Sequence, residues 1–223
     1  MTPADSVDAL RPWITARLDP LNAWDPVARA VHSDYDLAPD LHPGAVPLTA
    51  AAVLVPLVEH ETGLTVLLTR RADAMRKHSG QVAFPGGRSD PGEAPWTTAL
   101  REAEEEIGLD PARVAIAGLS STYETVTGYR ITPVVGFVRP GFEVRPNAAE
   151  VADVFETPFA WLMDPVNTEL HHHDRSDGVR RHFYAMPWED RLIWGATAGM
   201  LRALRHRLFG PDEVRVNMIG SAR

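Results

Sequence analysis

The feature that most constrains this chain is one amphipathic helix, predicted over residues 94–107. Pro95 suits the first turn of a helix, and Gly108 is typical of the residue that ends one. The apolar residues of the segment recur at helical spacing and form one stripe: Trp96, Leu100, Ala103 and Ile107. Away from this stripe, three glutamates share a face at positions i, i+3 and i+4: Glu102, Glu105 and Glu106. The helix is therefore predicted to bury one side and to hold three carboxylates together on another.

The segments around this helix predict a mixed sheet. Apolar runs predict strands at residues 50–57, 64–68, 114–123, 131–138, 150–155 and 181–186, the first two as a hairpin. Further helices are predicted from residue 6 to near Pro20, at 158–162 and over 191–208, whereas 31–48, 69–92 and 171–181 are polar. Strands and helices do not alternate regularly. This order favours an α/β fold with a mixed sheet over a doubly wound nucleotide-binding fold.

The length and composition limit the domain organisation and the partners. The 223 residues suggest one domain with appendages. We expect an N-terminal helix and loop at 1–45, the main domain over 46–210 and a C-terminal tail over 211–223. The chain has no Cys, which excludes a disulfide framework, a Cys-ligated zinc site and a thiol nucleophile. A formal net charge of −8 disfavours general binding of nucleic acid or anionic membranes, so we expect neither partner.

The sequence shows neither the pattern of an export signal nor an apolar segment of membrane-spanning length. The first residues, MTPADSVDAL, show no basic segment followed by an apolar stretch. The longest apolar run, residues 50–58, contains a Pro and is far shorter than the about 20 residues that a membrane helix needs. We therefore expect a cytoplasmic protein.

The three helix carboxylates predict a metal site. Like charges at these spacings repel one another unless a cation lies among them, and hard divalent cations prefer carboxylate oxygens. The alternative is a solvated acidic face of an ordinary surface helix.

The residues that precede the helix favour the metal site. Residues 84–87 read Phe-Pro-Gly-Gly, and residues 87–109 follow the pattern Gly-x5-Glu-x7-Arg-Glu-Ala-x-Glu-Glu-x-Gly-Leu. At every defined position this segment resembles the Nudix box. The resemblance implies an α/β/α sandwich with a mixed sheet, in which a loop–helix–loop binds Mg²⁺ or Mn²⁺. It also implies hydrolysis of a nucleoside diphosphate linked to another moiety.

The same resemblance implies the role of each residue. The predicted metal ligands are Glu102, Glu105, Glu106 and a backbone carbonyl of Gly86 or Gly87. Arg101 and Glu93 resemble the pair that braces the loop against the helix. Alternatively, Arg101 forms an ordinary i, i+4 pair with Glu105, and both statements can hold together.

The stretch directly before the box predicts the substrate. Residues 67–87 follow Leu-Leu-Thr-x-Arg-Ala-x3-Arg-x3-Gly-x3-Phe-Pro-Gly-Gly, and at each defined position they resemble the coenzyme A pyrophosphatase branch of the Nudix hydrolases. Five cationic or titratable residues lie within nine positions: Arg70, Arg71, Arg76, Lys77 and His78. Such a patch suits the diphosphate and 3′-phosphate of coenzyme A (CoA), because Arg side chains match phosphate oxygens. The alternative is a solvated basic loop.

The general base has two candidates. Glu150 lies in Asn-x-x-Glu-Val, a place comparable to that of a carboxylate beyond the box that helps to activate water in related enzymes. Glu105 is the second candidate, and its place in the box makes it slightly preferable. Two further features are assigned no part in the reaction. His171–His173 are three adjacent His that cannot all face one ion, and Trp161, Trp188 and Trp194 are expected in the core.

The expected activity is cleavage of the diphosphate of CoA or its thioesters to 4′-phosphopantetheine, or its acyl form, and 3′,5′-ADP. Alternatives are another nucleoside diphosphate such as ADP-ribose, and a non-catalytic Nudix-fold ligand sensor. A sensor is expected to lose box carboxylates, and none is lost here. Whether the protein forms a homodimer stays open.

Overall fold

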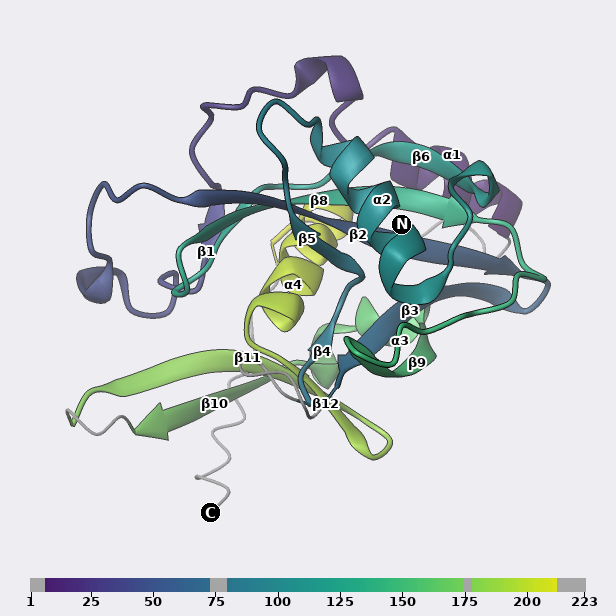
Figure 1. Cartoon of the computed structure of the whole chain (residues 1–223). Helices are drawn as coiled ribbons and strands as arrows, with labels where there is room; N and C mark the ends of the chain where they lie inside the picture. Colours follow the sequence, from purple (N-terminus) through teal and green to yellow (C-terminus); the bar gives the residue numbers. More distant parts are fainter. Residues whose placement is uncertain (1–6, 73–79, 175–177, 212–223) are drawn as a thin grey trace.

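The computed structural model describes residues 7–72, 80–174 and 178–211, and shows a mixed sheet with helices on both faces (Figure 1). The helices are α1 (Val7–Thr15), α2 (Pro95–Ile107), α3 (Phe159–Leu162) and α4 (Ala196–Phe209), with the 3₁₀ helices η1 (Leu21–Ala23), η2 (Pro39–Leu41), η3 (Pro111–Arg113) and η4 (Pro165–Asn167). The strands are β1 (His32–Ser33), β2 (Thr49–His60), β3 (Gly63–Arg71), β4 (Val82–Ala83), β5 (Gly86–Arg88), β6 (Val114–Leu119), β7 (Tyr123–Glu124), β8 (Tyr129–Val138), β9 (Val151–Pro158), β10 (Glu169–Asp174), β11 (Arg180–Trp188) and β12 (Arg191–Trp194).

Strand β2 is the centre of the larger sheet. It pairs in parallel with β8 and antiparallel with β3 and β5. Among the described residues this sheet has nine strands: six follow the order β1-β7-β8-β2-β3-β4, and β5, β6 and β9 pair with β2, β8 and β3. Residues 51–58 of β2 are all buried, as expected for a strand covered on both faces. The predicted hairpin of β2 and β3 is confirmed. A separate sheet has the order β10-β11-β12.

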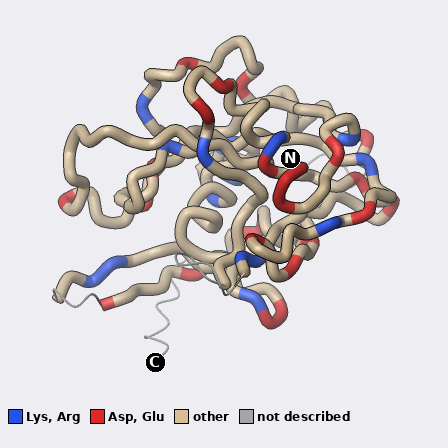
Figure 2. The backbone as a smooth tube through the Cα atoms, in the orientation of Figure 1, with Lys and Arg blue, Asp and Glu red and all other residues tan. Residues whose placement is uncertain are grey.

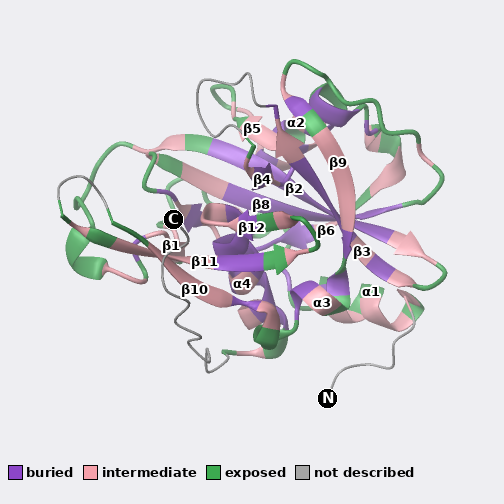
Figure 3. Cartoon of the chain, turned by 90° about the horizontal axis from the view of Figure 1, so that it is seen from below, coloured by how far each residue is buried: buried purple, intermediate pink, exposed green. Residues whose placement is uncertain are grey.

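Two hydrophobic cores flank the sheet because successive residues of β2 point to opposite faces. Ala52, Leu54 and Val58 pack towards α2, whose stripe residues Ala103 and Ile107 are fully buried. The other core combines residues of α1, α3, α4 and β12: Ile14, Phe159, Leu162, Ile193, Leu201 and Leu204. In Figure 3 the buried residues follow the strands of the sheet and the length of α4. The predicted α/β/α arrangement is confirmed.

The region after residue 168 differs from the sequence prediction in two places. The expected helix over 191–208 is wrong at its start, because residues 191–194 form β12 and the helix begins at Ala196. Gly195 separates the two elements with a φ of 61°, a value at which an L side chain is strained. The sequence predicts no strand in the polar stretch 171–181 before residue 181, but residues 171–174 belong to β10 and pair with β11, which begins at Arg180.

The N-terminal segment packs directly on the sheet. Ile14 and Leu18 are buried, and Asp19 forms a bridge with Leu119. Strand β1 then adds in parallel to β7. Strand β1 also contacts α4, and the His32 and His206 rings lie 6.4 Å apart.

Candidate active site

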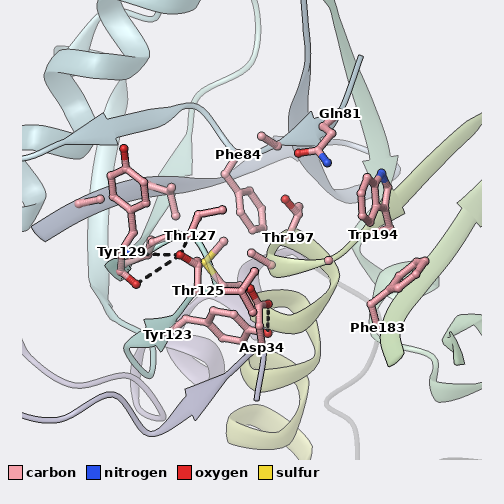
Figure 4. A pocket seen from close by; sticks show the side chains of 18 of the residues that line it. Asp34, Gln81, Phe84, Tyr123, Thr125, Thr127, Tyr129, Phe183, Trp194 and Thr197 are labelled. Atoms are coloured by element: carbon pink, nitrogen blue, oxygen red, sulfur yellow. Dashed lines mark hydrogen bonds between the residues drawn. The ribbon is translucent and has the colours of Figure 1, made fainter. Parts of the chain in front are cut away.

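One large cavity opens between the two sheets and has a volume of about 1110 Å³ (Figure 4). Its walls come from β5, α2, the β7–β8 turn, β11, β12, the start of α4 and residues 33–41. Four carboxylates of the described residues line it. Those of Glu102, Glu106 and Glu150 lie near the guanidinium of Arg71, and that of Asp34 belongs to the segment 33–41. Figure 2 shows acidic residues gathered along α2.

Glu106 is the most deeply buried of these carboxylates, with 3% of the residue exposed. It accepts a hydrogen bond from the Gly86 N–H at 3.1 Å, and Arg71 Nη1 lies 3.7 Å from its Oε1. Burial raises the pKa of Glu106 to about 7, and the charges of Glu102 and Glu150 act in the same direction. A buried carboxylate with two like-charged neighbours is a group that a cation would stabilise.

Glu102 faces the loop that precedes the helix. Gly87 lies so close that a Cβ built on it would overlap the Glu102 carboxyl group, which explains why this position has no side chain. At Gly86, a Cβ would instead overlap the backbone of Ala52 and Val53. The two glycines therefore let the loop approach both the carboxylates of α2 and the strand β2.

Backbone hydrogen bonds hold the turn that carries Glu150 beside the cavity. The Asn147 N–H donates to the Glu106 carbonyl at 2.8 Å, which fixes the 147–150 turn to the end of α2. The Ala72 N–H donates to the Glu150 carbonyl at 2.8 Å, which ties the same turn to the end of β3. Two elements distant in sequence thus bring Glu150 beside Glu106.

Arg101 lies behind the cavity rather than in its wall. Its guanidinium binds both Glu93 oxygens, and it also donates to Glu102 Oε1 at 2.7 Å and to the Arg88 carbonyl at 3.2 Å. This network lowers the pKa of Glu93 to about 2, chiefly through the hydrogen bonds from Arg101. The contacts match the predicted brace between loop and helix.

Glu105 differs from Glu102 and Glu106, because its side chain does not line the cavity. Residues advance by about 100° along a helix, so Glu105 and Glu106 point in clearly different directions although both are near Glu102. The Glu105 side chain is 60% exposed, lies 3.4 Å from Arg101 Nη1 and does not line the cavity. Its predicted part in metal binding or in catalysis stays a prediction.

Of the predicted phosphate-binding cations that the structure describes, one lines the cavity and one does not. Arg71 lines the cavity and faces Glu106, whereas Arg70 is at the end of β3 and outside the cavity wall. Arg76, Lys77 and His78 lie outside the described residues.

Several cavity residues were missed in the sequence. Asp34 falls in a segment interpreted as a loop, and no local pattern marks it. Trp194 was expected in the core, yet it lines the cavity beside Phe183, with ring centroids 5.2 Å apart. Trp161 and Trp188 do pack on the core, as expected. His171 pairs with Glu169 at 2.7 Å.

The donor set of the cavity fits a hard divalent cation. Carboxylate oxygens are the donors that Mg²⁺ and Mn²⁺ prefer. Within the described ranges, no three His, Cys, Asp or Glu side chains are already gathered in a metal-binding group. Burial is the main cause of the raised pKa of Glu106, and repulsion from Glu102 and Glu150 adds to it. This repulsion opposes closer approach of the carboxylates until a cation compensates it.

A loop–helix that carries carboxylates against the central strand of an α/β/α sandwich is the arrangement of the Nudix fold. The NUDIX domain family matches residues 48–196 of this chain. The proteins named "Uncharacterized Nudix hydrolase NudL" from Yersinia pestis (strain Pestoides F) and Yersinia pseudotuberculosis (serotype O:1b, strain IP 31758) are each 39% identical over 161 residues, which cover 71% of this chain and 79% of theirs. The crystal structure of a NUDIX hydrolase from Nitrosomonas europaea aligns with a TM-score of 0.47 and 18% identity over 82% of this chain and 85% of that one.

The chain therefore belongs to the Nudix hydrolase family. Enzymes of this family generally use divalent metal ions such as Mg²⁺ or Mn²⁺. No helix in the described part of the chain is both long and apolar enough to cross a membrane.

Proposed function

We propose that this Nudix hydrolase cleaves the diphosphate bond of CoA or its thioesters. The products are 4′-phosphopantetheine, or its acyl form, and 3′,5′-ADP. The observation that carries the proposal is the position of residues 67–87, whose pattern resembles the CoA pyrophosphatase branch. Arg71, Phe84 and Gly86 of this stretch line the same cavity as the carboxylates of α2. These three residues of the substrate pattern share the cavity with the carboxylates, which supports the proposal.

Glu102 and Glu106 are the proposed metal ligands, with a backbone carbonyl of Gly86. Glu105 completes the predicted set if its side chain swings from Arg101 towards Glu102. A bound divalent cation would neutralise charge on the diphosphate and acidify a water molecule. Arg101 acts as a positioning residue, because it holds Glu102 and ties the helix to Glu93 and the loop.

Glu150 is the proposed general base. Its carboxylate lines the cavity next to Glu106, whereas Glu105 does not line it. An ionised Glu150 would accept the proton of the attacking water. Glu105 stays the alternative base, because apo geometry alone does not rule out a candidate.

Arg71 is proposed to bind a phosphate oxygen of the diphosphate. In the absence of substrate it faces Glu106, so it can exchange one anionic partner for another. Arg70, Arg76, Lys77 and His78 are proposed to supply the remaining positive charge, with the 3′-phosphate as their target.

A substrate panel with product identification tests the proposal. CoA, acyl-CoAs, ADP-ribose, NADH and dNTPs are incubated with the purified full chain and Mg²⁺ or Mn²⁺, and the products are identified by mass spectrometry. We expect 3′,5′-ADP from CoA substrates, and a kcat loss of about 10²-fold or more for Glu106→Gln. Preferred cleavage of ADP-ribose would favour the alternative substrate class. Binding without turnover of any compound would favour a ligand sensor.

A further inference from the structure

The cavity extends beyond the carboxylates. This part of it, here called the distal chamber, is bounded by residues 33–41, the 125–129 turn, Phe183 and Trp194. Figure 4 shows Tyr129 on one side of it, Phe183 and Trp194 on the other, and Tyr123 with Asp34 below. Apart from Asp34, its labelled side chains are aromatic, hydroxyl or amide groups.

Three large side chains that line the chamber are exposed to solvent. Leu41 is 36% exposed, Val126 is 40% exposed and Tyr129 is 37% exposed, and all three line the cavity. Large apolar groups that surround a concave surface are typical of a ligand site. The apolar contacts of a ligand would remove this surface from water.

A partly buried carboxylate, that of Asp34, holds the wall of the chamber in place. Asp34 accepts hydrogen bonds from the Tyr123 hydroxyl and from the Val126 N–H, both at 2.9 Å. The Thr125 hydroxyl lies 2.9 Å from that of Thr127, which closes the same turn. The N-terminal segment and the β7–β8 turn are therefore fixed to each other, and the apolar surface between them is preformed.

The charged and titratable groups of the chamber lie at its base and along one hairpin. Asp34 places a carboxylate at its base, and the positive charge of Arg181 acts on that carboxylate. His173 and His182 line the cavity on the same hairpin as Arg181. The remaining polar groups near the aromatic walls are uncharged: the hydroxyls of Thr125, Thr127 and Thr197 and the amide of Gln81. The Thr197 hydroxyl donates to the Val82 carbonyl, and the Thr125 and Thr127 hydroxyls pair with each other. A hydroxyl oxygen that donates its proton within the protein can still accept a bond from an amide N–H.

We infer that the distal chamber binds the pantetheine arm of the substrate together with a thioester-linked acyl group, and that Leu41, Val126 and Tyr129 set the preference for acyl chains. The inference rests on the proposed function. The hydroxyl groups match the two amides of pantetheine, and the exposed apolar side chains match the acyl tail. The nucleotide half then lies on the side of Arg71 and the carboxylates. This makes the N-terminal segment, which precedes the NUDIX match, part of the specificity site.

The first test is a chain-length series. The kcat/KM values of the full chain are measured for CoA and for its acetyl, butanoyl, hexanoyl and octanoyl thioesters. A fully buried methylene is worth a factor of about three to four, and the partly open chamber leads us to expect at least about tenfold between acetyl- and hexanoyl-CoA. A flat or falling series overturns the inference, even if CoA itself is cleaved.

The second test uses a matched pair of variants. Val126→Asn puts a polar group into the chamber and should cut the hexanoyl-to-acetyl ratio to less than about threefold. Val166→Asn is the control, because Val166 is 70% exposed and does not line the cavity, and its ratio should stay that of the parent. Leu41→Asn replaces Val126→Asn if thermal unfolding shows that the latter is not folded. A ratio that both chamber variants leave intact contradicts the assignment.

The third test separates the inference from the proposed function. Octanoyl-pantetheine carries no diphosphate, so its binding to the metal-free chain by titration calorimetry does not depend on hydrolysis. We expect binding with a negative heat-capacity change, as apolar burial produces, and weaker binding to Val126→Asn. Absence of binding overturns the chamber assignment. Binding in a protein that cleaves neither CoA nor acyl-CoA overturns the proposed function alone.

Discussion

Arg101 and Glu93 form a two-point ion pair across the loop–helix junction. Arg101 Nε and Nη2 each lie 3.1 Å from a different Glu93 oxygen, so the two planar groups meet side by side. The third nitrogen, Nη1, reaches Glu102 at 2.7 Å. One guanidinium thus couples the loop to a carboxylate that lines the cavity. A single point charge could not make these three contacts in fixed directions.

Replacing Arg101 tests this coupling. Arg101→Lys keeps the charge but loses the planar pair, so Glu102 is no longer held in one direction. We expect kcat to fall by about tenfold or more and the metal concentration for half-maximal activity to rise, with KM changed little. Steady-state kinetics over a Mg²⁺ series measures both effects.

Arg139→Lys is the control for this substitution, because Arg139 is exposed and does not line the cavity. It should retain the parent's kinetics. Parent-like metal dependence in Arg101→Lys would contradict a positioning role.

The same pair should make the stability of the fold depend on pH. The Glu93 pKa is about 2 in the folded protein against an ordinary value of 4.5, so the folded state favours the ionised form. This contribution is present above the unfolded value and is lost as the pH falls towards the folded one. We expect Glu93→Gln to lower the free energy of unfolding by about 1 to 2 kcal/mol near neutral pH, and by much less near pH 3.

Urea denaturation in EDTA measures this difference without interference from bound metal. Thr98 also donates to Glu93, at 2.8 Å, and this bond can persist in the Gln variant. A gap between parent and variant that stays constant from neutral to acid pH would show that Glu93 stabilises the loop by shape rather than by charge.

The two candidate bases can be separated by charge-neutral substitutions. If Glu150 accepts the proton, Glu150→Gln should lower kcat by about 10²-fold with KM nearly unchanged, because the interaction is made mainly in the transition state. Glu105→Gln should then have the smaller effect. A base must be ionised, so the acid side of the pH–kcat profile should flatten in the variant that removes it.

Glu104→Gln is the matched control, since Glu104 is exposed on the same helix and does not line the cavity. The profiles are recorded at saturating metal. A near-normal kcat for Glu150→Gln, with a large loss for Glu105→Gln, would assign the base to Glu105 instead.

The sequence predicts those parts of the site whose residues are close together in the chain, and it predicts poorly those that long-range contacts bring together. The helix, its stripe and the closeness of Glu102 to Glu106 follow from local spacing. Helical spacing also separates Glu105 from Glu106, but it does not show which of the two faces the cavity; that depends on the positions of the loop and Arg101. The contact between the 147–150 turn and the end of α2 is long-range, so only a short motif hinted at Glu150.

The distal chamber is even harder to predict from the sequence, because long-range contacts form it. Asp34 gains its role from two partners about ninety positions away, Tyr123 and Val126, and no local pattern carries that information. The start of the last helix was misjudged for a different reason. Ile193 fits both a helical stripe and a strand, and only the pairing of β12 with β11 decides between them.

Alanine substitutions at the adjacent glycines Gly86 and Gly87 should impair different properties, stability in one case and metal binding in the other. A Cβ on Gly87 would meet the end of the flexible Glu102 side chain, whereas one on Gly86 would meet the backbone of β2. We expect Gly87→Ala to fold with a Tm near that of the parent but to need about tenfold more metal, because the displaced Glu102 is a proposed ligand. Gly86→Ala should instead lose about 2 kcal/mol or more of stability, because main chain cannot move aside as a carboxylate can. Thermal unfolding in EDTA and metal titration of activity measure the two effects separately. Loss of stability in Gly87→Ala, with parent-like metal dependence in its folded fraction, would mean that Glu102 does not bind the metal.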